Sequence, residues 1–559
     1  MLSIRDVIAS LRGKKSHERG VQGYLNSLPE EFHEDSQQRH LIRNVLAQLQ
    51  ETEETSVEKK LLVIISGGPG TGKSVVAETI LTIWSHMCAD KDKTKHEDVS
   101  YNDYGVILLE GQTFRRRKRE IATDLKPCLD LWSGKVERQK DGRVWERDIV
   151  VVDEAHRAPP FRDSEAGKSF LPPRRVTHNR DDLARRRQLV TDFTTDALLS
   201  GAKDKERNLP LEFELLLTRA AQEAKKCLIV VRDANQVYSP LAMTNWEFAQ
   251  SISAILGVQC SWDRESEDIL DLPTETDGWH VINEKLSTQH RTSEKWAALV
   301  RELLSVGEVD LNVLKSTYGA FFEEGDGFVR FSDDLPSTGA QVETNSTFEG
   351  FLMNDAESFM EWVESQQRTA KQSAEAHYFR VLATFSWANR TRIQLDELSG
   401  HVYGWAPDAY PVNANAAVDS ATHIGKDDAE EKLAAWPRKE KYDVNEDGVG
   451  YNASCQNQDF TAVGVIVGPH LRWSPSVDRP GVGEWMLNET GWQEFQKSSR
   501  KVQAQLQVDD SKEQLLEMAL SEAYILLTRP INRCGVYFCD QAARDALERV
   551  GFERVERAY

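Results

Sequence analysis

The sequence predicts an α/β protein with two doubly wound parallel sheets, and two observations predict this class. Short runs of Val, Ile and Leu occur in two groups along the chain and are nearly continuous, which is typical of strands buried on both faces of a parallel sheet. Segments with apolar residues three and four positions apart separate these runs and indicate helices. Strands that alternate with helices favour doubly wound sheets, and two groups of strands indicate two such domains.

Each expected element follows from one of these patterns. The first group of expected strands comprises residues 61–66, 106–109, 149–152 and 228–231. The second group comprises residues 381–385, 463–467, 524–527 and 536–539. The clearest helical patterns cover residues 74–87 and 513–523.

Shifts in composition divide the chain further. We expect a helical lead-in at residues 1–57, a first domain at 58–275 and a second domain at 276–559. The first domain would carry an insertion at about 157–222, which is rich in Arg and then in Leu. The second would carry an insertion at about 388–448, where Ala, Asn and Asp predict a solvated loop or a small helical segment.

The charge balance and the apolar runs exclude several classes of protein. The 559 residues include 69 Lys and Arg against 90 Asp and Glu, a net charge of −21, which excludes a basic coat on nucleic acid. No apolar run approaches the roughly 20 residues of a membrane helix, and the first residues lack the apolar block of a secretory leader. We therefore expect a cytoplasmic protein. Its seven cysteines show neither CxxC pairs nor finger spacing, so we expect reduced thiols rather than zinc ligands or disulfides.

A glycine-rich loop follows the first expected strand and precedes a helix. It matches the pattern GxxxxGK[ST] with Gly67, Gly68, Pro69, Gly70, Thr71, Gly72, Lys73 and Ser74. The backbone N–H groups of such a loop, together with the N-terminus of the following helix, bind phosphate. We expect Lys73 to reach the β and γ phosphates of ATP and Ser74 to ligate Mg²⁺. A glycine turn without a ligand is the alternative interpretation.

Two acidic residues follow the strand expected at 149–152. Asp153 and Glu154 begin the sequence Asp-Glu-Ala-His, at the C-terminal end of a parallel strand, where open α/β sheets bind their ligands. We expect Asp153 to hold Mg²⁺, and Glu154 to orient and deprotonate the attacking water. Together with the upstream loop, these residues predict hydrolysis of a nucleoside triphosphate.

Three further segments resemble the third, fourth and sixth motifs of superfamily-one helicases. They are RDANQ at 232–236, QHR at 289–291 and YILLTR at 524–529. The resemblance implies that Gln236 faces the γ-phosphate, that Arg291 reaches it from the second domain, and that Arg529 acts as an arginine finger. Taken singly, Gln236 and Arg291 could be ordinary turn and surface residues, and Arg529 could cap a helix or pair with an acid.

The segment CQNQDFTAVGVI at 455–466 resembles the fifth motif of a bacterial family that shares its helicase-like domain with the group-three Schlafen proteins. The resemblance spans roughly residues 38–540 and implies two RecA-like domains with helical or loop insertions, ATP hydrolysis and a Mg²⁺ cofactor. This sequence departs from the family pattern at Asn457, Asp459 and Thr461, where Gly, Glu and Asp are usual. Upstream, Gln38 is the candidate for reading the adenine base.

Positive charge gathers at two places despite the acidic total. The first cluster follows the strand expected at 106–109 and comprises Arg115, Arg116, Arg117, Lys118 and Arg119. The second cluster comprises Arg174, Arg175, Arg180, Arg185, Arg186 and Arg187. Phosphate contact is one interpretation, and a solvated helix face or a network of salt bridges is the other. Trp387, Trp405, Trp436 and Trp473 are candidates for stacking on bases.

These motifs favour an ATP-dependent, nucleic-acid-stimulated helicase or translocase that acts on single-stranded DNA or RNA. The alternative is an ATP-gated regulatory subunit that acts with a protein partner, such as a nuclease in bacterial anti-phage defence, without processive unwinding. A small-molecule kinase with the same loop is disfavoured by the two arginine motifs in a second domain.

Overall fold

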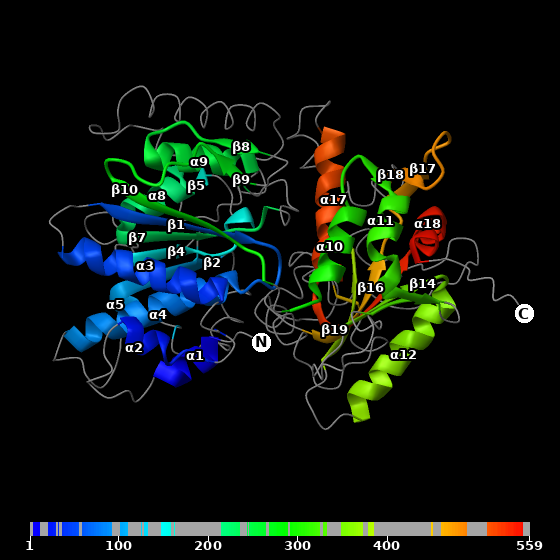
Figure 1. Cartoon of the computed structure of the whole chain (residues 1–559), viewed down its shortest axis with the longest axis horizontal. Coiled ribbons are helices and arrows are strands. Elements are labelled where there is room, and N and C mark those ends of the chain that lie inside the picture. Colours follow the sequence, from blue (N-terminus) through cyan, green and yellow to red (C-terminus); the bar gives the residue numbers. More distant parts are fainter. Residues whose placement is uncertain are drawn as a thin grey trace, which may run out of the picture. The chain divides into compact units, whose positions relative to one another are not determined.

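The structure is a computed structural model that describes part of the chain. This part comprises residues 4–11, 21–29, 32, 36–54, 59–91, 101–109, 125, 128–131, 147–157, 161–162, 214–234, 243, 245–263, 268–288, 291–324, 328–332, 348–372, 378–384, 449–450, 460–488 and 511–551. The chain divides into two compact units, Met1–His290 and Arg291–Tyr559 (Figure 1).

The first unit is built on a six-stranded sheet with the order β10-β1-β7-β4-β2-β3. All of its strand pairs are parallel. Its strands are β1 (Lys60–Gly67), β2 (Gly105–Leu109), β3 (Leu129–Leu131), β4 (Arg147–Val152), β7 (Ala224–Val231) and β10 (Trp279–Leu286). Since β7 lies between β1 and β4, the C-terminal ends of these three strands adjoin one another at one edge of the sheet.

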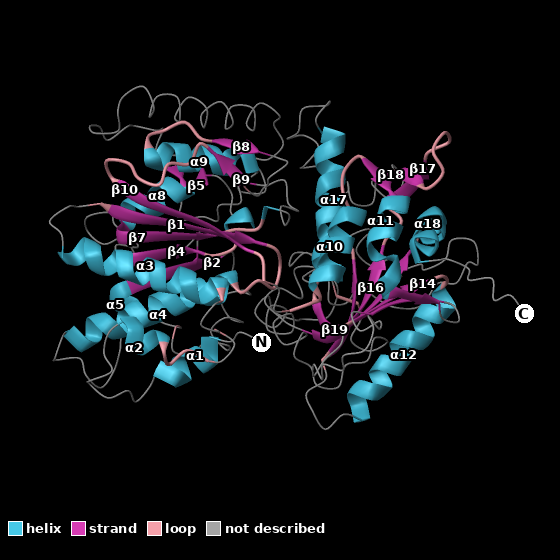
Figure 2. Cartoon of the chain, viewed as in Figure 1, coloured by secondary structure: helices cyan, strands magenta, loops and turns pink. Residues whose placement is uncertain are grey.

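Helices cover both faces of this sheet, as Figures 1 and 2 show. One face carries α1 (Ile4–Leu11), α2 (Val21–Leu25), α3 (Gln37–Glu54), α4 (Lys73–Lys91) and α5 (Tyr101–Tyr104). The other carries α8 (Leu216–Glu223) and α9 (Asn245–Leu256). Leu61, Val63 and Ile65 of β1 join the first core, whereas Leu62 and Ile64 join the second. Successive side chains of a strand point to opposite faces, so burial on both faces requires the continuous apolar run.

Short elements complete the first unit. A single turn of 3₁₀ helix, η3 (Ala155–Arg157), follows β4. Two small antiparallel pairs are formed by β5 (Phe161–Arg162) with β6 (Glu214–Leu215), and by β8 (Ser261–Asp263) with β9 (Asp268–Leu270).

The second unit has a mixed six-stranded sheet with the order β12-β13-β14-β19-β16-β15. Its strands are β12 (Phe322–Glu324), β13 (Phe328–Ser332), β14 (Glu349–Met353), β15 (Phe379–Ala383), β16 (Phe460–Val467) and β19 (Pro530–Phe538). The last four are parallel to one another, and β12 and β13 form an antiparallel edge. A separate three-stranded antiparallel sheet contains β11 (Glu308–Asp310), β17 (Leu471–Pro475) and β18 (Val482–Leu487).

The helices of the second unit pack on these sheets. They are α10 (Glu294–Leu303), α11 (Leu311–Tyr318), η5 (Gly319–Phe321), α12 (Ala356–Gln372), α17 (Ser511–Leu527) and α18 (Gln541–Gly551). Glycines in two strands make room for aromatic rings. A Cβ added at Gly535 of β19 would lie 2.6 Å from the Trp362 ring of α12, and one at Gly350 of β14 would lie 2.4 Å from the Trp296 ring of α10.

Two expectations from the sequence are corrected. Residues 524–527, expected as a strand, form the last turn of α17, because α17 is buried at this end and a short apolar run does not distinguish a buried helix from a buried strand. Residues 279–286, expected in the second domain, form β10 and pair with β1 in the first sheet. The two units therefore divide between His290 and Arg291 rather than between residues 275 and 276.

The insertions were expected to lie outside the cores. Residues 388–448 fall outside the described part of the chain. Of residues 157–222, most also fall outside it, but α8 at their end packs against β4 and β7 and belongs to the first core.

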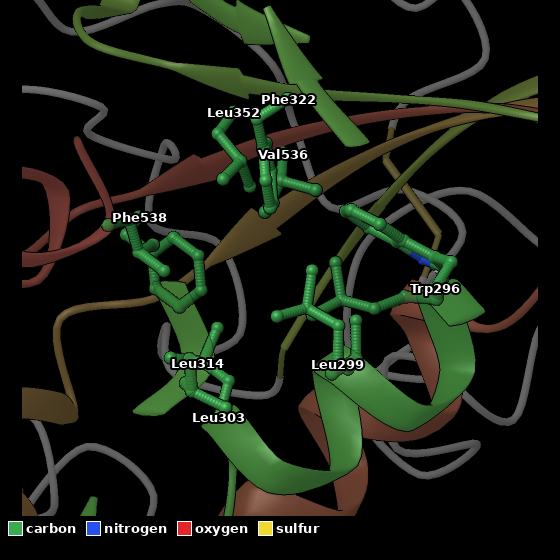
Figure 3. Close-up of a pocket in the computed structure, with 11 residues that line it drawn as sticks. Trp296, Leu299, Leu303, Leu314, Phe322, Leu352, Val536 and Phe538 are labelled. Carbon is green, nitrogen blue, oxygen red and sulfur yellow. Dashed lines mark hydrogen bonds between the residues drawn. The ribbon is translucent and has the colours of Figure 1, made fainter. Parts of the chain in front are cut away.

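A small apolar cavity of about 10 Å³ lies in the core of the second unit (Figure 3). Side chains from α10, α11 and the strands point into it, among them Leu299, Leu303, Phe322, Leu352 and Val536. Every lining residue is apolar, and a buried water needs two or more polar partners, so the cavity is dry.

Enlarging this cavity is expected to destabilise the second unit. Leu299→Ala removes side-chain carbons that line it, and such core truncations cost about 2–5 kcal/mol, because the transfer free energy is lost and a larger void remains. The matched control, Val313→Ala on α11, changes a side chain that is 54% exposed and is expected to cost less than about 0.5 kcal/mol. Urea unfolding of both variants measures the difference, and equal losses would contradict the expectation.

Candidate nucleotide-binding site

The glycine-rich loop joins β1 to α4 and adopts backbone conformations that only glycine tolerates well. Gly67, Gly70 and Gly72 have φ values of 144°, 85° and 82°. A Cβ on Gly67 would also lie 2.4 Å from the carbonyl oxygen of Leu286, the last residue of β10. Thr71 closes the loop on itself, since its Oγ1 donates a hydrogen bond to the Gly68 carbonyl at 3.0 Å.

Lys73 is the first residue of α4, and its side chain turns back onto the loop. Its Nζ donates to the carbonyl oxygens of Gly67 and Gly68, both at 2.7 Å. The same Nζ lies 3.6 Å from Oδ2 of Asp233, a buried residue just after β7. The ammonium group of Lys73 is therefore held beside the loop, at the sheet edge where phosphate would bind.

Ser74 and Asp153 meet although they come from different elements. Oγ of Ser74, in the first turn of α4, donates a hydrogen bond of 2.7 Å to Oδ1 of Asp153, which follows β4. A hydroxyl and a carboxylate oxygen are the hard ligands that Mg²⁺ prefers, and Mg²⁺ commonly takes its other ligands from water and phosphate. The two residues predicted as metal ligands thus fit the ion by their chemistry and their proximity.

Glu154 has an unusual backbone, and its carboxylate faces a histidine. Its φ of 55° lies in the left-handed region, which costs a non-glycine residue on the order of 1 kcal/mol and is common at functional sites. Oε2 of Glu154 lies 3.0 Å from Nε2 of His156. Nδ1 of His156 accepts a hydrogen bond of 3.1 Å from the backbone N–H of Asp233. His156 and Asp233 are parts of the site that the sequence pattern did not assign, although both belong to motifs it identified.

Gln38 lies against the same loop. It is in the first turn of α3, is 1% exposed, and its Nε2 donates to the Thr71 carbonyl at 3.2 Å. Its neighbour Gln37 bonds to the end of β10, donating to the Lys285 carbonyl at 2.7 Å and accepting from the backbone N–H of Ser287 at 3.0 Å. These hydrogen bonds attach the start of α3 to the glycine-rich loop and to the end of β10. Gln38 therefore lies beside the loop in the fold although it is far from it in the sequence.

Arg232, the first residue of the segment RDANQ, is buried beside aromatic rings. The side chain is 1% exposed and lies over the Phe248 ring, 4.0 Å from its centroid, and over Trp262. It also donates to Oδ1 of Asn245. Burial lowers the pKa of the Arg232 guanidinium to about 9. Arg232 thus packs on α9 and β8, while its backbone N–H donates to the Ile65 carbonyl of β1 at 2.9 Å.

The other candidate residues fall into two groups. The first group lies outside the described residues and comprises Gln236, the basic residues at 115–119, the cluster at 174–187, Trp387, Trp405 and Trp436. Arg291 and Arg529 lie in the second unit: Arg291 is half-buried just before α10, and Arg529 is buried between α17 and β19. Trp473 is a core residue rather than an exposed stacking surface, since it is 5% exposed and packs edge-on against Trp485.

The parallel sheet, the glycine-rich loop after β1 and the acidic pair after β4 define a P-loop nucleotide-binding protein with a RecA-like sheet. A family model, Schlafen group 3, DNA/RNA helicase domain, matches residues 60–540, and the chain belongs to this family. The match confirms the resemblance found in the sequence. None of the curated proteins compared with the chain matches it. Within the described residues, no helix is long and apolar enough to span a membrane.

Proposed function

We propose that this protein hydrolyses ATP and uses the energy to move along single-stranded DNA or RNA, as a superfamily-one type of helicase or translocase. The observation that carries the proposal is the convergence of Lys73, Ser74 and Asp153 at one loop, with Ser74 and Asp153 2.7 Å apart. This is the arrangement that an NTP phosphate chain and its magnesium ion require, and it occurs in a chain of a helicase-domain family.

Each residue of the site has a role in this proposal. The backbone N–H groups of the loop and Lys73 bind the phosphates, while Ser74 and Asp153 hold Mg²⁺, which when bound neutralises phosphate charge. Glu154 accepts the proton of the attacking water. Gln236, Arg291 and Arg529 contact the γ-phosphate, and Arg529 stabilises the transition-state charge. Gln38 contributes to recognition of the base.

The proposal places the two sheets in two RecA-like domains, with a narrow basic track for nucleic acid. The cluster from Arg115 to Arg119 supports such a track, because guanidinium groups remain charged and bind phosphates in a bidentate manner. A net charge of −21 is compatible with it, since local positive potential rather than total charge directs binding along a groove.

Single-stranded nucleic acid is expected to stimulate ATP hydrolysis. ATPase rates measured with and without single-stranded DNA or RNA, together with strand displacement on a tailed duplex, provide the test. The salt dependence of binding adds a second readout, because each phosphate contact to a single strand contributes about −0.7 to the log–log slope. A rate that does not respond to either polymer would contradict the motor, and would favour an ATP-gated subunit acting with a protein partner such as a nuclease.

A further inference from the structure

The side-chain amide of Gln37 makes four hydrogen bonds to the end of β10 and the residue after it. Its Nε2 donates to Oε1 of Glu284 at 2.8 Å and to the carbonyl oxygen of Lys285 at 2.7 Å. Its Oε1 accepts from the backbone N–H of Ser287 at 3.0 Å and from the Ser287 hydroxyl at 3.4 Å. An amide has two N–H donors and two acceptor positions, so its whole hydrogen-bonding capacity is directed to this short segment.

Two of these bonds make the Gln37 amide a substitute for a further strand. β10 is the outermost strand of the first sheet and has β1 on its inner side. In a parallel pair, a residue donates to the residue before its partner and accepts from the residue after it. The amide does the same with the Lys285 carbonyl and the Ser287 N–H, so it stands opposite Leu286. It therefore extends the sheet by one residue and fixes the end of β10.

On its inner side, Leu286 is paired with the first glycine of the phosphate-binding loop. Leu286 and Gly67 are partners in the parallel register of β10 and β1. The two residues approach closely, because a Cβ on Gly67 would lie 2.4 Å from the Leu286 carbonyl oxygen. The Gly67 carbonyl in turn accepts from Nζ of Lys73 at 2.7 Å. Gln37, Leu286 and Gly67 thus form one row across the sheet, and the phosphate-binding lysine is bonded to the last of them.

The neighbouring glutamine holds a second point of the same loop. Gln38 is buried, and its Nε2 donates to the Thr71 carbonyl at 3.2 Å. Two consecutive residues of α3 therefore hold the loop, Gln37 through the end of β10 and Gln38 directly. The two glutamines differ in this respect, since Gln38 touches the loop itself whereas Gln37 acts on the strand beside it.

We propose that Gln37 is a positioning residue that fixes the start of the phosphate-binding loop, at Gly67, through the end of β10. A loop that is already fixed loses less conformational entropy when it binds phosphate. Gln37 therefore acts on the affinity for the nucleotide rather than on the chemical step. This inference rests on the proposed ATP hydrolysis.

Gln37→Met tests the role of the amide, because methionine is also unbranched and of similar length but has no N–H donor and only a weak acceptor. We expect the KM for ATP and the Kd of a fluorescent ATP analogue to rise about tenfold, the worth of one to two hydrogen bonds. The value of kcat should stay within about threefold of normal, since the reacting groups are retained.

The matched control is Gln22→Met in α2. The Gln22 amide donates to Oδ1 of Asn26 at 2.7 Å, in an exposed pair, and its loss should change neither KM nor Kd. A thermal melt of both variants shows whether each is folded. Gln37→Met with a lower melting temperature but an unchanged Kd would overturn the inference, because Gln37 would then only stabilise the fold. A loss confined to kcat would overturn it as well.

Inorganic triphosphate distinguishes an effect on the loop from an effect on base recognition. The loop binds phosphate, so Gln37→Met should raise the Ki of inorganic triphosphate, measured against the fluorescent analogue, by the same factor as the Kd of the analogue. A loss confined to the nucleotide would overturn the inference, since Gln37 would then act on the base. Absence of ATP binding by the unaltered protein would instead refute the proposed nucleotide site, which is a different result.

Hydrogen exchange on the unaltered protein does not depend on the folding of the variants. It reports the local opening that exposes a single backbone N–H group. Coupling between two sites is reciprocal, so an ATP analogue bound at the loop should slow exchange at Ser287, whose N–H is bonded to the Gln37 side chain. Exchange at Ser287 that does not respond to a saturating analogue would overturn the inference.

Discussion

Replacing Lys73 by Ala is expected to lower kcat/KM for ATP hydrolysis by about 10³-fold or more. The ammonium group lies beside the loop, bonded to the Gly67 and Gly68 carbonyls, where it can transfer to the β and γ phosphates of ATP. A cation at this point stabilises both the bound phosphates and the charge that develops in the transition state, and no other side chain of the loop carries positive charge. Steady-state phosphate release measures the loss.

Lys60→Ala is the matched control for this variant. Lys60 begins β1, the strand that ends at the loop, so it is at the opposite end of the same element. It donates to the Ala221 carbonyl at 3.1 Å and lies over the Trp279 ring, away from the phosphate-binding edge. Lys60→Ala should retain its turnover, and a thermal melt of both variants should show that each is folded. Normal turnover in Lys73→Ala would refute the assignment of the site.

Glu154→Gln is expected to lower kcat by about 10²–10⁴-fold while leaving ATP affinity nearly unchanged. The amide has almost the same size and shape as the carboxylate but cannot accept a proton from the attacking water, and general base catalysis contributes a factor of this size. Ser74, Asp153 and Lys73 remain in place to bind the phosphates and Mg²⁺. Single-turnover hydrolysis measures the chemical step, and titration with a fluorescent ATP analogue measures affinity.

The matched control for Glu154→Gln is Glu275→Gln. Glu275 lies just before β10 and forms an isolated antiparallel bridge with His280. Glu275 is exposed and pairs with Lys59, at the edge of the sheet where β1 begins. Solvent screens an ion pair between exposed side chains, and this pair lies away from the phosphate-binding loop, so hydrolysis should not change. If Glu154→Gln instead lost ATP affinity with an unchanged kcat, Glu154 would be a binding residue rather than the base.

The strands of the first sheet could be predicted because burial on both faces demands a continuous apolar sequence. Residues 61–66 and 149–152 read as strands for this reason, and both are strands. The apolar run at 524–527 carries the same signal but forms the end of α17, since a helix that is buried on all sides is also continuously apolar. The strand β10 was not predicted, because an edge strand mixes polar with apolar residues, and the β10 sequence WHVINEKL does so.

The residues of the site can likewise be separated into those that the sequence predicts and those that only the fold brings together. The sequence by itself determined the loop from Gly67 to Ser74 and the acidic pair Asp153 and Glu154, because each is a local pattern whose chemistry depends on adjacent residues. It also determined membership of the helicase-domain family, which rests on the order of such patterns along the chain.

Only the tertiary structure decided which residues of these motifs are in contact. Ser74 and Asp153 are 79 positions apart, and His156 and Asp233 are 77 positions apart, yet each pair is within hydrogen-bond distance. The physical reason is the strand order, which places β7 between β1 and β4 and so gathers three strand ends at one edge. Strand order depends on how whole elements bury their apolar faces together, and no local pattern contains it. The hydrogen bond between His156 and the backbone of Asp233 is therefore visible only in the folded chain.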